Sequence, residues 1–166
     1  MLPRAKHIVV RDKDSFALAY MYHDNPIFSG DFAYPIVEKI LVEKDEWVPY
    51  NIINLNPYKR DSSSKKKVAE IIESRGGDWI FIAGDVGEDI PLYRELQVSM
   101  ETISLFDWTS HTLRETISFL ASAKYGLATR LHILLLLQFF HIPLSPLVYQ
   151  EKITKVLGIQ EDTPTL

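Results

Sequence analysis

LATRLHILLLLQFFHIPL, residues 127–144, is the most apolar stretch of this 166-residue chain, and it decides the fold that we expect. A membrane-spanning helix needs roughly 20 mostly apolar residues, and placing Arg130 and two histidines in lipid would be costly. Residues 127–141 are therefore predicted to form a helix inside the protein rather than a membrane anchor. Because this helix is apolar on nearly all sides, other structure must surround it.

The neighbouring segments also predict helices. Apolar residues recur at helical spacing over residues 107–124, and a break is expected at Gly126. Ser145 can cap a further helix over residues 146–157. The C-terminal third is therefore predicted to be a three-helix segment.

The first two thirds of the chain mix strand and helix patterns. β-Branched and aromatic residues, or alternation of large and small side chains, predict strands. The expected strands cover residues 7–10, 15–22, 46–55, 78–83 and 94–105. A short helix is favoured over a strand at residues 35–44, because Pro35 suits the first turn of a helix.

Residues 64–75 predict the clearest helix of this part. Val68 and Ile72 lead an apolar stripe, and the serines at residues 62–64 can cap the first turn. The glycine pair at residues 76–77 supplies a left-handed stop.

Together these patterns predict an α+β fold. A small mixed β-sheet with one packed helix is expected in the N-terminal two thirds, followed by the C-terminal three-helix segment. Without a Gly/Ser linker between them, we expect a single domain over residues 1–166. Its sheet-rich layer would cover residues 1–105 and its helical layer residues 106–160.

Composition is that of an ordinary globular protein. The chain is 46% hydrophobic and 24% charged, which excludes a disordered tail or a coiled-coil rod. With 18 basic and 22 acidic residues the net charge is −4, so nucleic-acid binding would need a local basic patch. The chain has no cysteine, which excludes disulfides and thiolate metal sites and fits an intracellular protein, cytoplasmic or nuclear.

Three carboxylates follow the predicted buried strand within five positions: Asp85, Glu88 and Asp89. Gly84 and Gly87 flank the first of them, so a tight turn that a ligand can approach is expected there. Oxygen ligands of this kind suit a hard cation such as Mg²⁺. A metal-dependent hydrolase at these residues is one alternative function, and solvated acids on a turn are the simpler interpretation.

A basic run lies at the start of the helix predicted over residues 64–75. It consists of Lys59, Arg60, Lys65, Lys66 and Lys67. Lysines near a helix N-terminus oppose the helix dipole, so they add little local stability and can serve another purpose. With the neighbouring serines they could hold phosphate, which makes an accessory nucleic-acid-binding protein a second alternative. A solvated loop is the simpler interpretation.

The five histidines form no catalytic set that is visible in the sequence. A catalytic base needs an orienting carboxylate and a nucleophile. His132 and His141 are nine positions apart, which puts them on opposite sides of a helix. The sequence therefore favours a protein that is not an enzyme and needs no cofactor.

By elimination, we expect a protein–protein interaction or assembly module that docks through its apolar C-terminal helices. The expected anchors are large side chains: Leu135, Phe139, Phe140, Leu147 and Tyr149. Three helices give little cover to one that is apolar all round. Part of its surface is therefore expected to meet a protein partner or a second copy of the chain.

Overall fold

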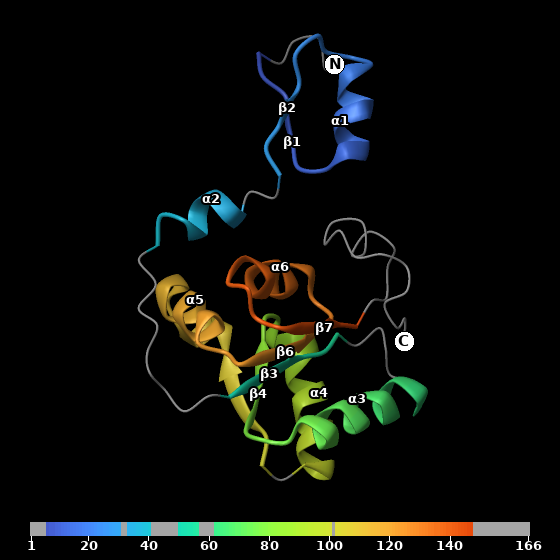
Figure 1. Cartoon of the computed structure of the whole chain (residues 1–166), viewed down its shortest axis with the longest axis vertical. Coiled ribbons are helices and arrows are strands. Elements are labelled where there is room, and N and C mark those ends of the chain that lie inside the picture. The colour runs from blue at the N-terminus through green and yellow to red at the C-terminus, as the bar shows by residue number, and fades with distance from the viewer. Residues whose placement is uncertain (1–5, 31–32, 41–49, 57–61, 101, 148–166) are drawn as a thin grey trace. The chain divides into compact units, whose positions relative to one another are not determined.

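The computed structural model describes residues 6–30, 33–40, 50–56, 62–100 and 102–147 (Figure 1). The chain divides into two compact units, residues 1–40 and residues 41–166, each with its own secondary structure. The single domain expected from the sequence stays a prediction.

The first unit contains a small strand–helix–strand element. Its parts are β1 (Val9–Val10), α1 (Lys13–Tyr20) and β2 (Ile27–Phe28), followed by the short helix α2 (Ala33–Val37). β1 and β2 pair in parallel, so α1 is the crossover between them. The strand expected at residues 7–10 is confirmed in its second half.

Residues 15–22, predicted as a strand, belong mostly to α1 instead. Asp12 caps this helix, because its carboxylate accepts hydrogen bonds from the Ser15 amide at 2.7 Å and from the Ser15 hydroxyl at 3.0 Å. The alternation of large and small side chains marks no buried face, since Tyr20 is exposed and the small Ala19 is buried. Ala17 and Ala19 are also strong helix formers.

The second unit alternates strand and helix along the chain. Its strands are β3 (Asn51–Asn54), β4 (Trp79–Ala83), β5 (Ser104–Asp107), β6 (Tyr125–Ala128) and β7 (Leu144–Pro146). Its helices are α3 (Ser62–Arg75), α4 (Val86–Ser99), α5 (Leu113–Ala121) and α6 (Leu131–Phe139), with a short 3-10 turn, η2 (Trp108–Ser110). The strands are all parallel, in the order β5-β4-β3-β6-β7.

Helices cover both faces of this sheet. Figure 1 shows α3 and α4 on one face and α5 and α6 on the other. On the α3–α4 face, Phe81 of β4 belongs to a core cluster with Val68 and Leu92 from the two helices. On the other face, Gly126 lies so close to Leu137 of α6 that an added Cβ would overlap the leucine side chain. Within the described residues, no helix has the length and apolar character needed to cross a membrane.

The predicted α+β fold is wrong, because the protein has an alternating α/β fold. In place of a small mixed sheet with one packed helix, the structure has a five-stranded parallel sheet and, in the first unit, a two-stranded sheet. The three-helix segment is wrong as well, because β6 and β7 lie within it. The physical cause is that a strand buried on both faces has the same continuous apolar pattern as a buried helix.

In the leucine-rich stretch, the pattern of a buried strand runs directly into the pattern of a buried helix. Residues 127–128 complete β6, and α6 begins only at Leu131. Gly126, expected to break a helix, lies inside a strand, and Pro146 ends β7 instead of starting a helix. The rest of that expected helix, after Leu147, lies outside the described residues.

Local patterns with clear ends are confirmed. α3 covers the helix predicted over residues 64–75, and Gly76 and Gly77 follow it with φ of +59° and +75°. β4 corresponds to the strand predicted at residues 78–83. The strand predicted at residues 94–105 is wrong for most of its length, because α4 extends to Ser99.

Candidate active site

The strand order reverses once in the five-stranded sheet, between β3 and β6. From β3 the chain passes to β4 and β5 on one side, and it then crosses back to β6 and β7 on the other. In open parallel sheets, ligands bind outside the carboxyl ends of the strands at such a point. β3 ends at Asn54 and β6 ends at Ala128, so the residues at and after these positions define the candidate site.

Arg130 lies at this reversal point, two residues after β6. Its guanidinium is held by Asp89 of α4: Nε lies 2.9 Å from Oδ2, and Nη2 lies 2.6 Å from Oδ1. Nη2 also donates to Glu88 Oε2 at 3.1 Å. The Asp89 side chain is fully buried and that of Arg130 is 24% exposed, so the arginine is the end of the pair that a ligand can reach.

Backbone amides fix Asp89 from its other side. Its Oδ2 accepts hydrogen bonds from the amides of Gly84 at 2.9 Å and Asp85 at 3.1 Å, the two residues that follow β4. A carboxylate with this many donors is held in one orientation. Asp89 therefore fixes the position of Arg130 as well as balancing its charge.

Asn54, fully buried at the end of β3, links the same groups. Its Nδ2 donates to the Ile82 carbonyl at 2.9 Å and lies 3.5 Å from Asp89 Oδ2. Its Oδ1 accepts from the Arg130 amide at 3.2 Å. The ends of β3, β4 and β6 are thus joined in one network around a single arginine.

Electrostatics keep this arginine charged. Partial burial acts to lower the pKa of Arg130, but the hydrogen bonds and charge of Asp89, and then those of Glu88, outweigh it and raise that pKa. Among the described residues, nothing accepts a hydrogen bond from the third guanidinium nitrogen, Nη1. The N–H donors of Nη1, on a fixed cation, suit an oxygen of a carboxylate or phosphate.

The N-terminus of α6 adjoins this cation. Arg130 is the N-cap residue of α6 and its side chain makes no capping hydrogen bond, so it leaves the first-turn amides uncapped. The helix dipole adds partial positive charge at this end. His132 is exposed in the same turn, and histidine is the side chain most often used in general acid–base catalysis. The arrangement can hold an anionic substrate beside a proton-transfer group.

The three carboxylates expected to bind a metal have other partners. Asp85 caps α4 by accepting from the Glu88 amide at 3.2 Å, while Glu88 and Asp89 both bind Arg130. The tight turn expected around Asp85 is the start of this helix. In the part of the chain that the structure describes, no three His, Cys, Asp or Glu side chains gather to hold a metal ion.

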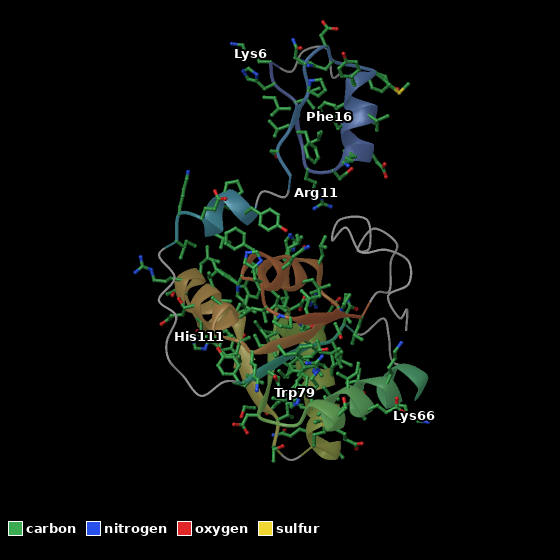
Figure 2. All side chains as sticks on the ribbon, in the orientation of Figure 1. Lys6, Arg11, Phe16, Lys66, Trp79 and His111 are labelled. Carbon is green, nitrogen blue, oxygen red and sulfur yellow. The ribbon has the colours of Figure 1, made fainter. Side chains whose placement is uncertain are left out.

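The basic run is described only in part: Lys65, Lys66 and Lys67 are covered, whereas Lys59 and Arg60 lie outside the described residues. Figure 2 shows Lys66 on α3. Lys65 pairs with Glu95 at 3.2 Å and Lys66 with Glu70 at 3.8 Å, and both pairs are exposed. Lys65 and Lys66 therefore take part in surface ion pairs, which contribute little to stability.

Two of the expected docking anchors lie inside the protein. Leu135 and Leu147 are only 1% and 2% exposed. Phe139 and Phe140, at the end of α6, are half-buried, with ring centroids 5.2 Å apart in an edge-to-face pair. Tyr149 lies outside the described residues. The leucines at the centre of α6 form part of the protein's core rather than an apolar surface.

The sequence of the chain also matches a known family. A model described as polysaccharide pyruvyl transferase matches residues 1–136, a range that contains Asn54, Asp89, Arg130 and His132. The chain belongs to the polysaccharide pyruvyl transferase family. No curated protein and no solved structure matches it.

Membership of the polysaccharide pyruvyl transferase family corrects the expected function. The non-enzymatic interaction or assembly module is wrong, because the family indicates an enzymatic role in polysaccharide modification. The same family match contradicts the two alternatives, nucleic-acid binding and metal-dependent hydrolysis. The exclusion of disulfides holds, because the chain has no cysteine.

Sequence reasoning missed Arg130 and Asn54 as site residues. In the sequence Arg130 stands only as an interruption of an apolar run, although a charged residue between a buried strand and a buried helix is itself a signal. Asn54 gives a weaker signal of the same kind, a polar residue at the end of an apolar strand. Neither can be connected with Asp89 until the strand order is known, because strand order determines which strand ends meet.

Proposed function

We propose that this protein transfers a pyruvyl group from an activated donor to hydroxyl groups of a polysaccharide, at the site around Arg130. The observation that carries the proposal is the match of the polysaccharide pyruvyl transferase family to residues 1–136. This range ends just beyond Arg130 and the first turn of α6. The geometry at the strand reversal supplies the chemical groups that such a reaction needs.

A pyruvyl donor carries a carboxylate that must be bound and oriented. Arg130 offers Nη1 for this carboxylate, while Asp89 and Glu88 hold its other two nitrogens. The open N-terminus of α6 adds backbone donors and partial positive charge. Because Asp89 fixes the guanidinium in advance, little of the binding energy is spent on ordering it.

The transfer is balanced when an enol phosphate of pyruvate is the donor. The methylene carbon of phosphoenolpyruvate takes up a proton, and C2 forms bonds to two hydroxyl oxygens of the acceptor. The C2–O bond to phosphate breaks, and phosphate leaves with the bridging oxygen. The two hydroxyl protons account for the new methyl group and the protonation of the released phosphate.

His132 is the residue that we assign to proton transfer. It is exposed in the first turn of α6, two residues after Arg130. An imidazole has one ring nitrogen that can accept a proton and another that can donate one, so it can take a hydroxyl proton and pass a proton to the substrate.

The test is an assay with phosphoenolpyruvate and neutral oligosaccharide acceptors. Wild-type protein is expected to release phosphate and to raise the acceptor mass by one pyruvate less one water. Arg130→Lys should lower the rate by roughly 100-fold, because an ammonium cannot keep the two-sided contact with Asp89 and still present a donor. Arg94→Lys, on the exposed surface of α4, is the matched control and should leave the rate unchanged.

Two results would contradict the proposal. Wild-type protein that modifies no acceptor would remove the transferase activity itself. Equal rates for Arg130→Lys and Arg94→Lys would keep the activity but remove Arg130 from the site.

A further inference from the structure

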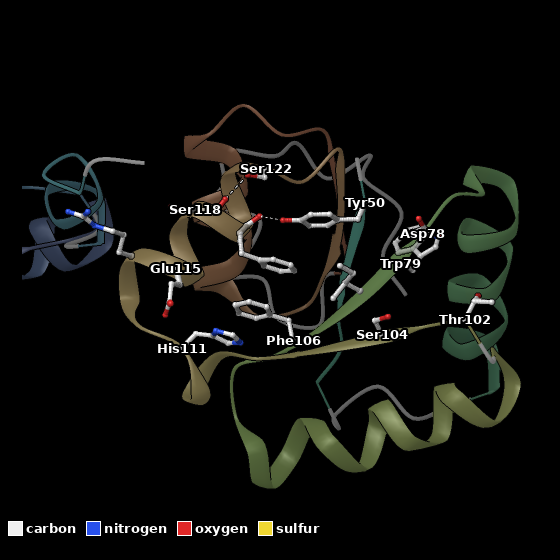
Figure 3. A pocket seen from close by; sticks show the side chains of 13 residues that line it. Tyr50, Asp78, Trp79, Thr102, Ser104, Phe106, His111, Glu115, Ser118 and Ser122 are labelled. Atoms are coloured by element: carbon white, nitrogen blue, oxygen red, sulfur yellow. Dashed lines mark hydrogen bonds between the residues drawn. The ribbon is translucent and has the colours of Figure 1, made fainter. Parts of the chain in front are cut away.

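A cavity of about 690 Å³ lies in the second unit, between α5 and the β4–β5 side of the sheet (Figure 3). None of the Arg130-site residues lines it. Its volume is within the range of ~300–1,000 Å³ that is usual for small-molecule sites.

One wall of the cavity is a continuous stack of four rings. Tyr50 stacks on Phe119 with centroids 4.8 Å apart, Phe119 on Phe106 at 3.9 Å, and Phe106 on His111 at 4.2 Å. The Tyr50 hydroxyl donates to the Phe119 carbonyl at 2.6 Å, which fixes the inner end of the stack. His111 is exposed at the outer end. The wall is therefore rigid, apolar and reachable from solvent.

Four polar side chains elsewhere in the lining have no intramolecular partner among the described residues. Asp78, Thr102, Ser104 and Ser118 all line the cavity, and in the described part of the chain their side chains form no hydrogen bond or ion pair. Three of them are exposed and Ser118 is half-buried. Figure 3 shows Asp78, Thr102 and Ser104 together on the side away from His111. These hydroxyl and carboxylate groups offer both donors and acceptors to a bound molecule.

This combination fits few classes of ligand. An anion is disfavoured, because the carboxylates of Asp78 and Glu115 outnumber the single cation Arg114 in the lining. A hydrocarbon chain is disfavoured as well, because it would bury hydroxyl groups and leave them unpaired. A sugar ring has apolar C–H faces and a dense set of hydroxyl groups. It can therefore pack on the aromatic wall and hydrogen-bond to the polar side chains.

We propose that this cavity binds a neutral saccharide segment of the polymer, at a place separate from the Arg130 site. The proposal goes beyond pyruvyl transfer, since saccharide binding here needs no donor and can be measured without one. A polymer bound at both the cavity and the Arg130 site would be held more tightly than at either site alone, because the second binding event is then intramolecular.

The test uses two neutral probes, a glucan hexasaccharide and a galactan hexasaccharide, titrated into the whole chain without donor. Binding is followed by calorimetry and by saturation transfer to the sugar protons. Ser104→Tyr places a ring inside the cavity and should weaken binding at least about tenfold. Asp78→Asn removes a charged hydrogen-bond acceptor and should weaken it by roughly five- to tenfold.

Matched controls lie away from the cavity. Val98→Tyr adds the same ring on α4, where Val98 is 88% exposed, and Glu73→Gln removes one exposed charge from α3. Both should bind the probes as the wild type does. Far-UV circular dichroism and urea midpoints for all four variants show whether each is folded.

The outcomes separate this inference from pyruvyl transfer. If neither hexasaccharide binds, or if folded Ser104→Tyr binds like Val98→Tyr, the saccharide cavity is overturned whether or not transfer occurs. If the probes bind and Ser104→Tyr blocks them while no acceptor is pyruvylated, the cavity stands and the transferase proposal fails.

Discussion

Asp89 has no exposed surface, yet it carries the charge that holds Arg130 in place. Replacing Asp89 with Asn keeps the size of the side chain but leaves the guanidinium without its buried counter-charge. Breaking such a pair from one side typically costs 3–5 kcal/mol, and partial exposure of Arg130 reduces this. We expect Asp89→Asn to lower the free energy of unfolding by about 2–4 kcal/mol, measured by urea denaturation, and to lower the proposed transferase activity with it.

Glu88 is the natural control for this prediction. It binds the same arginine at 3.1 Å, but its side chain is 43% exposed. An exposed ion pair contributes about 0–1 kcal/mol, so Glu88→Gln should have a small effect on unfolding. Equal losses for the two variants would show that burial of Asp89 is not what makes the pair important.

At the scale of the element, the close packing of α6 against β6 depends on one small residue, Gly126. Gly126 lets α6 pack directly on the sheet, because any Cβ there would overlap Leu137. Gly126→Ala should therefore destabilise the protein by about 1–3 kcal/mol through overpacking. Gly87→Ala in the first turn of α4, where an added Cβ has room, should instead be neutral or stabilising by up to ~1 kcal/mol. Similar urea midpoints for the two variants would contradict the close packing of α6.

The start of α5 makes stability depend on pH. Thr112 and Glu115 form a capping box in which Glu115 accepts from the Thr112 amide at 2.7 Å and from its hydroxyl at 2.8 Å. The Thr112 amide first, and then its hydroxyl, lower the pKa of Glu115 below its ordinary value of 4.5. A lowered pKa adds stability above pH 4.5, and this stability is lost as the pH falls through the folded-state pKa. Glu115→Gln should therefore show a smaller fall of Tm between pH 5 and pH 3 than the wild type.

The elements that sequence reasoning predicted well have local signals at their ends. α3 has serines at its start and glycines after its end, and β4 is bounded by Asp78 and Gly84. β6 and α6 lack such a boundary, because Thr129 and Arg130 are a short interruption in one apolar run. The strand predicted at residues 15–22 was wrong for a different reason: the alternation of large and small residues there does not follow burial, and most of the segment forms α1.

At the scale of the whole molecule, the candidate site is assembled from distant parts of the chain. Asn54 and Asp89 are 35 positions apart, and Asp89 and Arg130 are 41 apart. The carboxylate half could be found in the sequence, because Asp89 follows a recognisable buried strand. The cationic half could not, because its pairing with Asp89 depends on the crossover that brings β6 next to β3. A local pattern does not contain that information.

The same sheet order predicts where the molecule is most stable. β3 pairs with β4 and β6, and Ile52, Ile53 and Leu127 have no exposed surface, so amides there should open only on global unfolding. In the first unit, Ile27 and Phe28 of β2 are about half exposed, and the two strands are two residues long. Hydrogen exchange followed by mass spectrometry should therefore give the slowest amides in β3, β4 and β6, and exchange at least about 100-fold faster in β1 and β2. Comparable protection in both units would mean that the first unit draws its stability from contacts beyond its own short strands.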